Sequence, residues 1–101
     1  MVKPILLRRY LAIGNQIYKI EFSSLAKKDI RKIPEEIKER LENSLIDLSF
    51  NPFLGYKLLG KYKGKMAYDF SFRYRIIYGI DKNNGILIVY EVWHRQRDYK
   101  K

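Results

Sequence analysis

Apolar residues repeat with different periods in the two halves of the chain. Residues 17–22 are rich in β-branched and aromatic side chains and are bounded by polar residues, which is typical of a strand. Apolar residues then recur at helical spacing in two runs, Ala26, Ile30 and Ile33, followed by Ile37, Leu41, Leu45 and Leu48. Pro34 separates the runs, because proline suits the first turn of a helix and not its interior. The first half therefore predicts a strand followed by a helical hairpin.

The second half changes to the two-residue period of strands. A short mixed segment at 65–71 precedes residues 73–80 and 86–94, in which apolar side chains occupy alternate positions. Residues 81–85 are dense in Asp, Asn and Gly, which favours a tight turn between the last two strands. The sequence therefore predicts an α+β fold of order β-α-α-β-β-β, in which an antiparallel sheet carries the helical hairpin on one face.

The length of 101 residues fits one domain, and 47% apolar residues supply enough side-chain surface for its core. Residues 17–101 are expected to form this single domain. Residues 1–16 are expected to be an N-terminal extension, since a proline and two adjacent arginines interrupt any regular pattern there. The longest apolar run, 85–93, is about half of a membrane-spanning helix, and no signal peptide is evident. We therefore expect a cytosolic protein with no membrane partner.

The charge of the chain is strongly positive and unevenly distributed. The 21 Lys and Arg residues outnumber the 11 Asp and Glu residues, so the formal net charge is +10. Residues 23–50 are neutral, whereas residues 51–101 carry eleven basic and four acidic side chains. A general lysine-rich composition would also make the protein basic, but it would spread the excess evenly. The asymmetry indicates a binding face for a polyanion, with nucleic acid favoured over an anionic membrane.

Missing residue types exclude several kinds of catalysis. The chain has no Cys, which removes disulfides, thiolate zinc sites and a cysteine nucleophile. Its single histidine, His94, excludes a two-histidine ribonuclease site, and no Gly-rich phosphate-binding loop is present. Four acidic residues are expected to form the solvated face of the second helix: Glu35, Glu36, Glu39 and Glu42. We therefore expect neither a metal ion nor a cofactor.

Basic and aromatic residues of the second half remain as candidates for function. The basic ones are Lys57, Lys61, Lys63, Lys65, Arg73, Arg75, Arg95 and Arg97, and the aromatic ones are Tyr68, Phe70, Phe72, Trp93, His94 and Tyr99. Cations neutralise phosphates and exposed rings stack on unpaired bases, so this set suits RNA. It also suits metal-free cleavage, in which side chains deprotonate the 2′-hydroxyl, stabilise the phosphorane and protonate the 5′-oxygen. Tyr74 and Tyr78 are instead expected in the core, because they share a strand face with isoleucines.

Six short segments over residues 17–101 carry a resemblance to a known family. They are Tyr18-Lys19-Ile20-Glu21-Phe22, Ala26-Lys27-Lys28-Asp29, Asn51-Pro52, Lys57-Leu58-Leu59-Gly60, Tyr74-Arg75-Ile76-Ile77-Tyr78, and His94-Arg95 with Tyr99. In this order and spacing they resemble the RelE/ParE superfamily of toxins from toxin–antitoxin systems. The resemblance implies a small cytosolic toxin that forms a hetero-oligomer with a cognate antitoxin and is inactive in it. In the RelE branch it implies a metal-independent endonuclease that enters the ribosomal A site and cuts mRNA.

Matched residue by residue, the resemblance implies three catalytic roles. Arg75 corresponds to the arginine that stabilises the phosphorane. Arg95 corresponds to the arginine that protonates the leaving group or stabilises its charge. Tyr99 corresponds to the C-terminal tyrosine that orients the nucleotide.

The catalytic lysines of the RelE branch fall on Met66 and Tyr68 in this chain. Lys65 and Lys63 are close enough to replace them if the strand register differs, and of the two Lys65 is assigned a catalytic role. His94 is a candidate acid or base. The other candidates are assigned to RNA binding: Lys57, Lys61, Lys63, Tyr68, Arg73 and Arg97.

The residues leave three functions open. The arginines and the C-terminal tyrosine favour an mRNA endonuclease with the ribosome and mRNA as partners. The missing lysines favour a ParE-like toxin that inhibits DNA gyrase by binding. The third function is RNA binding without chemistry. In either toxin, the antitoxin is expected to cover the basic face with an acidic or apolar segment.

Overall fold

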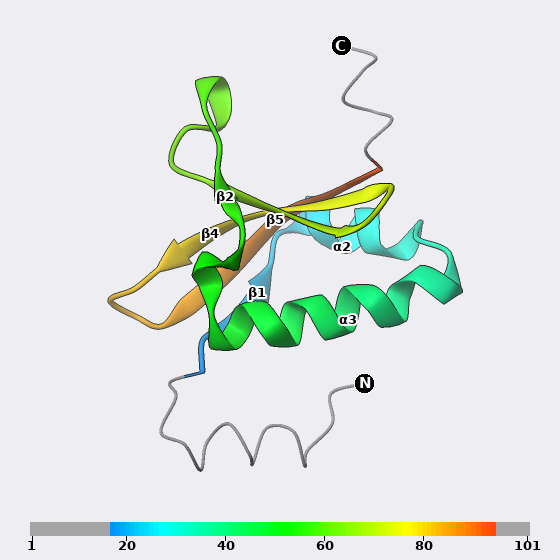
Figure 1. The fold of residues 1–101 in the computed structure, drawn as a ribbon, viewed down its shortest axis with the longest axis horizontal. Coiled ribbons are helices and arrows are strands. Elements are labelled where there is room, and N and C mark those ends of the chain that lie inside the picture. The colour runs from blue at the N-terminus through cyan, green and yellow to red at the C-terminus, as the bar shows by residue number, and fades with distance from the viewer. Residues whose placement is uncertain (1–16, 95–101) are drawn as a thin grey trace.

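The computed structural model describes residues 17–94 as a five-stranded sheet with two helices on one face (Figure 1). The elements are β1 (Lys19–Phe22), α2 (Ser24–Arg31), α3 (Glu35–Phe50), β2 (Tyr56–Lys57), β3 (Met66–Ser71), β4 (Tyr74–Asp81) and β5 (Ile86–His94). Short 3-10 turns at Pro52–Leu54 and Gly60–Tyr62 flank β2. The expected N-terminal extension lies outside the described residues, as do residues 95–101. No helix within 17–94 is long and apolar enough to cross a membrane.

The strands lie in the order β1-β5-β4-β3-β2. The β5–β4 and β4–β3 pairs are antiparallel, as the sequence predicts, and β3 also pairs antiparallel with the short strand β2. β1 instead pairs parallel with β5, with Lys19 opposite Ile86. The predicted α+β fold and its helical hairpin are confirmed, but the sheet is mixed rather than wholly antiparallel. Parallel neighbours need a long crossover connection, and the chain between β1 and β5 supplies one.

The core lies between the helices and one face of the sheet. Its buried members include Ala26, Ile33, Leu41, Leu45 and Leu48 from the helical hairpin and Ile76, Tyr78, Leu87, Val89 and Val92 from the strands. The predicted helical stripes and the core position of Tyr78 are therefore confirmed, and Tyr74 packs against the same core. Phe70 is also buried there and stacks on Tyr74, with 5.7 Å between the ring centroids.

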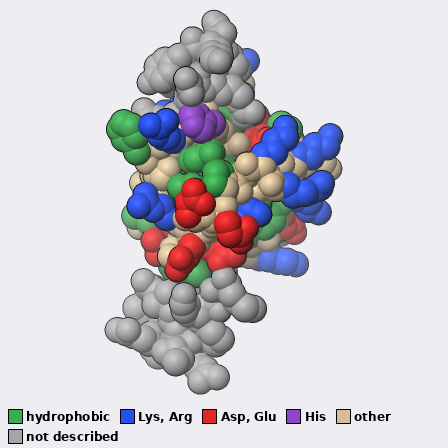
Figure 2. All heavy atoms as spheres, turned by 90° about the vertical axis from the view of Figure 1, so that its right-hand side faces the viewer, with side chains coloured by type: hydrophobic (Ala, Val, Ile, Leu, Met, Phe, Trp, Pro, Cys, Tyr) green, Lys and Arg blue, Asp and Glu red, His purple; other side chains and the backbone are tan. Residues whose placement is uncertain are grey.

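The acidic residues of α3 are exposed, as predicted for a solvated face. Figure 2 looks onto the end of the molecule at the right of Figure 1, and it shows acidic side chains grouped near the centre. Lys and Arg side chains gather along one side of this view. Within residues 17–94, no three His, Asp or Glu side chains come together as metal ligands.

Local signals fix where the helices begin. The Ser23 hydroxyl accepts a hydrogen bond from the backbone N–H of Ala26 at 3.0 Å, so Ser23 caps α2. Pro34 precedes α3, and Glu35 and Glu36 lie in its first turn, where negative charge is favourable beside the positive helix end. α3 ends at Phe50, directly before the Asn51-Pro52 pair that the sequence marks as a helix stop.

A bulge in β5 is held by two polar side chains of the α2 segment. Tyr78 lies opposite Val89 and Ile77 lies opposite Glu91, so Tyr90 is the extra residue of β5. The Ser23 hydroxyl donates to the Tyr90 carbonyl at 2.7 Å. The backbone N–H of Val92 donates to the buried Asp29 carboxylate at 3.0 Å. The pairing of β1 with β5 ends at Phe22 and Val89, so Ser23 and Asp29 bond backbone groups of β5 beyond that point and tie α2 to the strand that ends at His94.

Candidate functional site

The sheet face opposite the helices carries Arg75 and Lys65, two of the functional candidates. Side chains alternate between the two faces of a strand, so Ala67, Ile77 and Trp93 point away from the helices. Leu58 and Tyr62, from the segment between β2 and β3, pack against these three residues. This second, smaller cluster covers the middle of the face. We call this side of the sheet the open face.

Arg75 lies on the open face in a polar cluster with Asp69 and Tyr56. The Arg75 Nε donates to Asp69 Oδ1 at 3.0 Å, and the Tyr56 hydroxyl donates to the same oxygen at 3.1 Å. The Arg75 guanidinium carbon also lies 5.8 Å from the centroid of the Tyr56 ring. The side chains of Arg75 and Asp69 are 18% and 35% exposed, so an incoming anion can reach this ion pair.

The position of Tyr56 depends on the buried hydroxyl of Tyr78. This hydroxyl donates to the Pro52 carbonyl at 2.6 Å and accepts from the Gly55 N–H at 3.2 Å. A Cβ atom on Gly55 would lie 2.3 Å from the Ala67 carbonyl oxygen, so the chain passes too close to β3 for a side chain. Burial raises the pKa of Tyr78 to about 12, which keeps the donor protonated.

Lys65 lies at the opposite end of the open face. Its Nζ is 4.5 Å from the centroid of the Tyr90 ring, and that ring lies against Gly79, where a Cβ atom would be 2.9 Å from the ring carbon Cε2. Met66 pairs with Tyr78, which places Lys65 level with Gly79, four residues along β4 from Arg75. Four strand residues span roughly 13 Å. The structure therefore does not bring Lys65 and Arg75 together.

Two aromatic side chains and one carboxylate lie together on the open face, with Trp93 opposite Arg75 on the neighbouring strand. Trp93 is 6% exposed and meets the Tyr62 ring edge-on, with 5.4 Å between the centroids. The Trp93 indole N–H and, at 3.5 Å, the Tyr62 hydroxyl both donate to the Glu91 carboxylate. These rings pack against each other and against the sheet.

His94 and Tyr68 lie on the helix side of the sheet. The His94 ring meets Tyr74 edge-on at 5.0 Å between centroids, and Tyr74 belongs to the helix-side core. Tyr68 is half-buried against the same core, and so is Met66. The two positions that match the family's lysines therefore face away from Arg75.

The predicted RNA-binding residues are spread over several segments. Lys57, Lys61 and Lys63 are exposed around β2 and the segment that follows it. Arg73 is exposed in the turn between β3 and β4, beside Phe72, whose side chain is 83% exposed. The remaining candidates lie outside the described residues: Arg95, Arg97 and Tyr99.

Tyr56 and Asp69 contact each other and Arg75, and the sequence did not predict this grouping. A regular hairpin with Ser71 opposite Tyr74 would place Phe70 opposite Arg75. The register instead shifts between Asp69 and Ser71, so Asp69 lies opposite Arg75. The only sequence signal was that Asp69 is the one charged residue of β3.

Comparison with known proteins assigns this fold to a family. The family model for the ParE toxin of type II toxin–antitoxin systems matches residues 20–99. The chain therefore belongs to this family, and it is a toxin of a type II toxin–antitoxin system. The resemblance to the RelE/ParE superfamily that the sequence motifs indicated is confirmed.

Solved structures support the same assignment. A chain of the RelBE2 toxin–antitoxin complex from Mycobacterium tuberculosis matches with a TM-score of 0.72 and 27% identity, over 78% of this chain and 92% of that chain. A chain of the intact E. coli RelBE complex matches with a TM-score of 0.66 and 22% identity, over 76% and 95%. A chain of the RelE–RelB complex from Pyrococcus horikoshii matches with a TM-score of 0.62 and 16% identity, over 80% and 98%. The last two show a shared fold. No curated protein matches the chain.

Proposed function

We propose that this toxin cuts mRNA on the ribosome and that the Arg75, Asp69 and Tyr56 cluster is part of its active site. The observation that carries the proposal is the ion pair between Arg75 and Asp69 on an accessible face of the sheet. It offers a cation for a phosphate and, beside it, a carboxylate that can accept a proton. Exposed lysines around β2 supply further positive charge for the RNA backbone.

The proposed reaction is an internal displacement at phosphorus. The 2′-hydroxyl oxygen attacks the phosphorus, its proton passes to the Asp69 carboxylate, and the bond to the 5′-oxygen breaks. The leaving 5′-oxygen takes up one proton, so the products are a 2′,3′-cyclic phosphate and a 5′-hydroxyl. Arg75 stabilises the negative charge that develops on the phosphorane oxygens, where a fixed cation is most effective. Arg95 remains the candidate to protonate the leaving 5′-oxygen.

The proposed partner in the inactive state is a cognate antitoxin. The solved structures that match this chain include three toxin–antitoxin complexes, from a mycobacterium, E. coli and an archaeon. An antitoxin that covers the basic face of this toxin would remove both its affinity for RNA and access to Arg75. We therefore propose a hetero-oligomer of toxin and antitoxin.

One observation favours a second function, inhibition of DNA gyrase by binding. The positions of the catalytic lysines of the RelE branch hold Met66 and Tyr68, and both side chains pack against the helix-side core. A toxin that acts by binding alone needs no such lysines, and its basic face would then be a docking surface.

A paired assay distinguishes the two functions. The purified toxin is added to programmed ribosomes, and mRNA cleavage is mapped by primer extension. The same preparation is added to a gyrase supercoiling reaction. Cleavage within the A-site codon supports the endonuclease. Intact mRNA together with blocked supercoiling would refute the endonuclease and support inhibition of DNA gyrase.

A further inference from the structure

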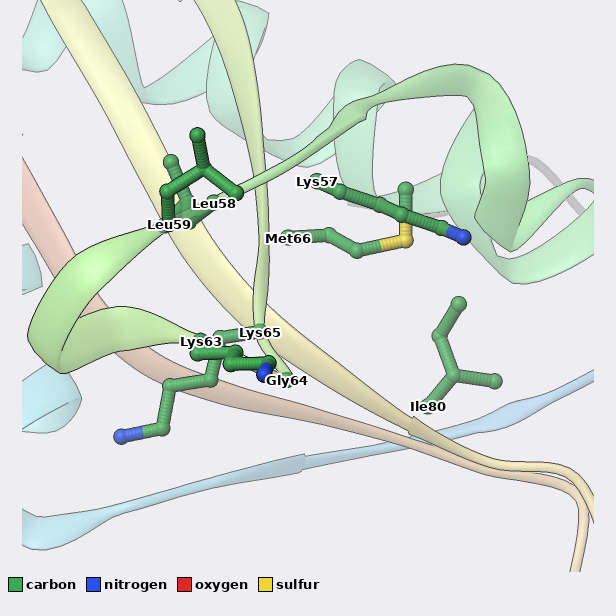
Figure 3. A pocket seen from close by; sticks show the side chains of 8 residues that line it. All are labelled: Lys57, Leu58, Leu59, Lys63, Gly64, Lys65, Met66 and Ile80. Atoms are coloured by element: carbon green, nitrogen blue, oxygen red, sulfur yellow. The ribbon is translucent and has the colours of Figure 1, made fainter.

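An open pocket of 380 Å³ lies at the sheet edge formed by β2 (Figure 3). Its apolar lining consists of Leu58 and Leu59 after β2, Met66 at the start of β3 and Ile80 on β4. Figure 3 shows Met66 between Leu59 and Ile80 in the middle of this lining. Leu59 stands at the rim with 84% of its surface exposed, so most of its apolar surface is not covered by the described residues.

Three lysines and Gly64 complete the lining of the pocket. Lys57 lies on one side of Met66, and Lys63 and Lys65 lie on the other (Figure 3). The Lys65 amino group lies over the Tyr90 ring in a cation–π contact. The amino groups of Lys57 and Lys63 make no ion pair with any residue in 17–94. No acidic side chain lines the pocket, so it has an apolar floor and an uncompensated positive rim.

The chemistry of this lining selects a particular kind of ligand. An unpaired RNA base binds best on an aromatic platform, and the pocket lining contains no aromatic ring. An aliphatic side chain would bury apolar surface against Leu58, Met66 and Ile80. If the ligand also carries carboxylates next to this aliphatic side chain, they would reach Lys57 and Lys63. The basic rim is thus complementary in charge to an acidic ligand. The pocket therefore fits an acidic peptide with an aliphatic anchor better than it fits RNA.

We propose that the pocket binds a leucine or isoleucine of the antitoxin that is flanked by Asp or Glu residues. This inference rests on the antitoxin partner proposed above. Since Lys57 and Lys63 are also predicted RNA contacts, an antitoxin segment in this pocket would compete with RNA for the same cations. The toxin would thus be neutralised by direct competition at the β2 edge.

Two surface variants test the pocket without disturbing the core. Leu59→Ser removes the exposed aliphatic rim, and Lys63→Glu reverses an exposed charge. Arg40→Glu, at an exposed position on α3, is the matched charge control. The probe is the protein encoded by the reading frame next to the toxin gene, labelled with a fluorophore, and its Kd is measured for the parent and each variant. Urea unfolding confirms that the variants are as stable as the parent.

We expect Leu59→Ser and Lys63→Glu each to weaken binding about tenfold or more, because each removes roughly one buried apolar group or one charge contact. Arg40→Glu should stay within about twofold of the parent, since an exposed charge outside the contact has little effect. Equal affinity of the parent and all three variants for the probe would refute the proposal that the pocket binds the antitoxin. It would leave the proposed mRNA cleavage unaffected. Equal weakening by Arg40→Glu and Lys63→Glu would also refute the binding of the antitoxin in the pocket, because the effect would then be one of net charge.

Two further outcomes separate the pocket from the proposed function. Variants that keep antitoxin affinity but lose ribosome affinity would assign the pocket to RNA and refute the inference. If the parent toxin does not bind the probe at all, the proposed antitoxin partner is refuted. The proposed pocket ligand is then refuted as well.

Discussion

Asp69→Asn separates the proposed chemistry from the stability of the fold. Asparagine has nearly the same size and keeps a carbonyl oxygen to accept from Tyr56 and Arg75, but it cannot take the proton of the 2′-hydroxyl. The ion pair that the change removes is partly exposed, with 18% of the Arg75 side chain and 35% of the Asp69 side chain accessible. Ion pairs in such surroundings contribute at most about 1 kcal/mol. The free energy of unfolding should therefore fall by no more than roughly 1 kcal/mol.

The cleavage rate of Asp69→Asn should fall much further. A positioned general base typically contributes about 10²–10⁴ in rate. That range corresponds to roughly 2.7–5.4 kcal/mol of activation free energy, several times the expected change in stability. The assay is single-turnover cleavage on programmed ribosomes at saturating ribosome concentration, with urea unfolding of the same samples. Toxin for the assay is purified as the antitoxin complex and then released.

Asp81→Asn is the matched control for this experiment. It makes the same chemical change at the far end of β4, where Asp81 accepts hydrogen bonds from Asn84 and not from Arg75. The control should cleave at the parent rate. An unchanged rate in Asp69→Asn would refute the role of Asp69 as a base. A faster rate would show that the carboxylate restrains Arg75 and takes no part in catalysis.

Three further predictions concern the core, the bulge and the charge. Tyr78→Phe should cost about 1–3 kcal/mol in urea unfolding, because it leaves the Pro52 carbonyl without its buried donor. The raised pKa of Tyr78 also means that its contribution is complete below pH 10 and is lost between pH 10 and about 12, so Tyr78→Phe should abolish this decline in a pH series. Asp29→Ala should cost about 1.5–3 kcal/mol by leaving the Val92 N–H unpaired, while Asp29→Asn, which keeps an acceptor, should cost less; equal losses would contradict the assigned hydrogen bond. Ribosome binding should weaken steeply between about 50 and 200 mM salt, and a constant Kd would refute the electrostatic account.

Apolar periodicity predicted the helices and the three long strands, because each places a continuous stripe of side chains in one core. It could not predict β2, which has two residues, both exposed. Nor does it encode strand direction, so the parallel pairing of β1 with β5 was missed.

The site was predicted less completely than the fold, for reasons of register. Arg75 was found from its motif, but its partner Asp69 depends on a bulge in β3, and a shift of one residue changes which side chains face each other. The burial of Asp29 was not predicted either, because its partner, the backbone N–H of Val92, is 63 residues away in the sequence. Lys65 was a candidate because it lies close in sequence to the family's lysine positions, and His94 because it is a possible acid or base. The sheet places Lys65 at the far end of the open face from Arg75 and His94 on the helix side.

Arg75→Ala in single-turnover cleavage tests the central claim most directly. Loss of a preorganised donor to the phosphorane should lower the rate at saturation about a hundred- to thousand-fold, with a much smaller change in ribosome affinity. Arg73→Ala, the neighbouring exposed arginine, should instead weaken binding and leave the saturated rate unchanged. Cleavage by Arg75→Ala at the parent rate once ribosomes are saturating would contradict the assignment of Arg75 to the active site.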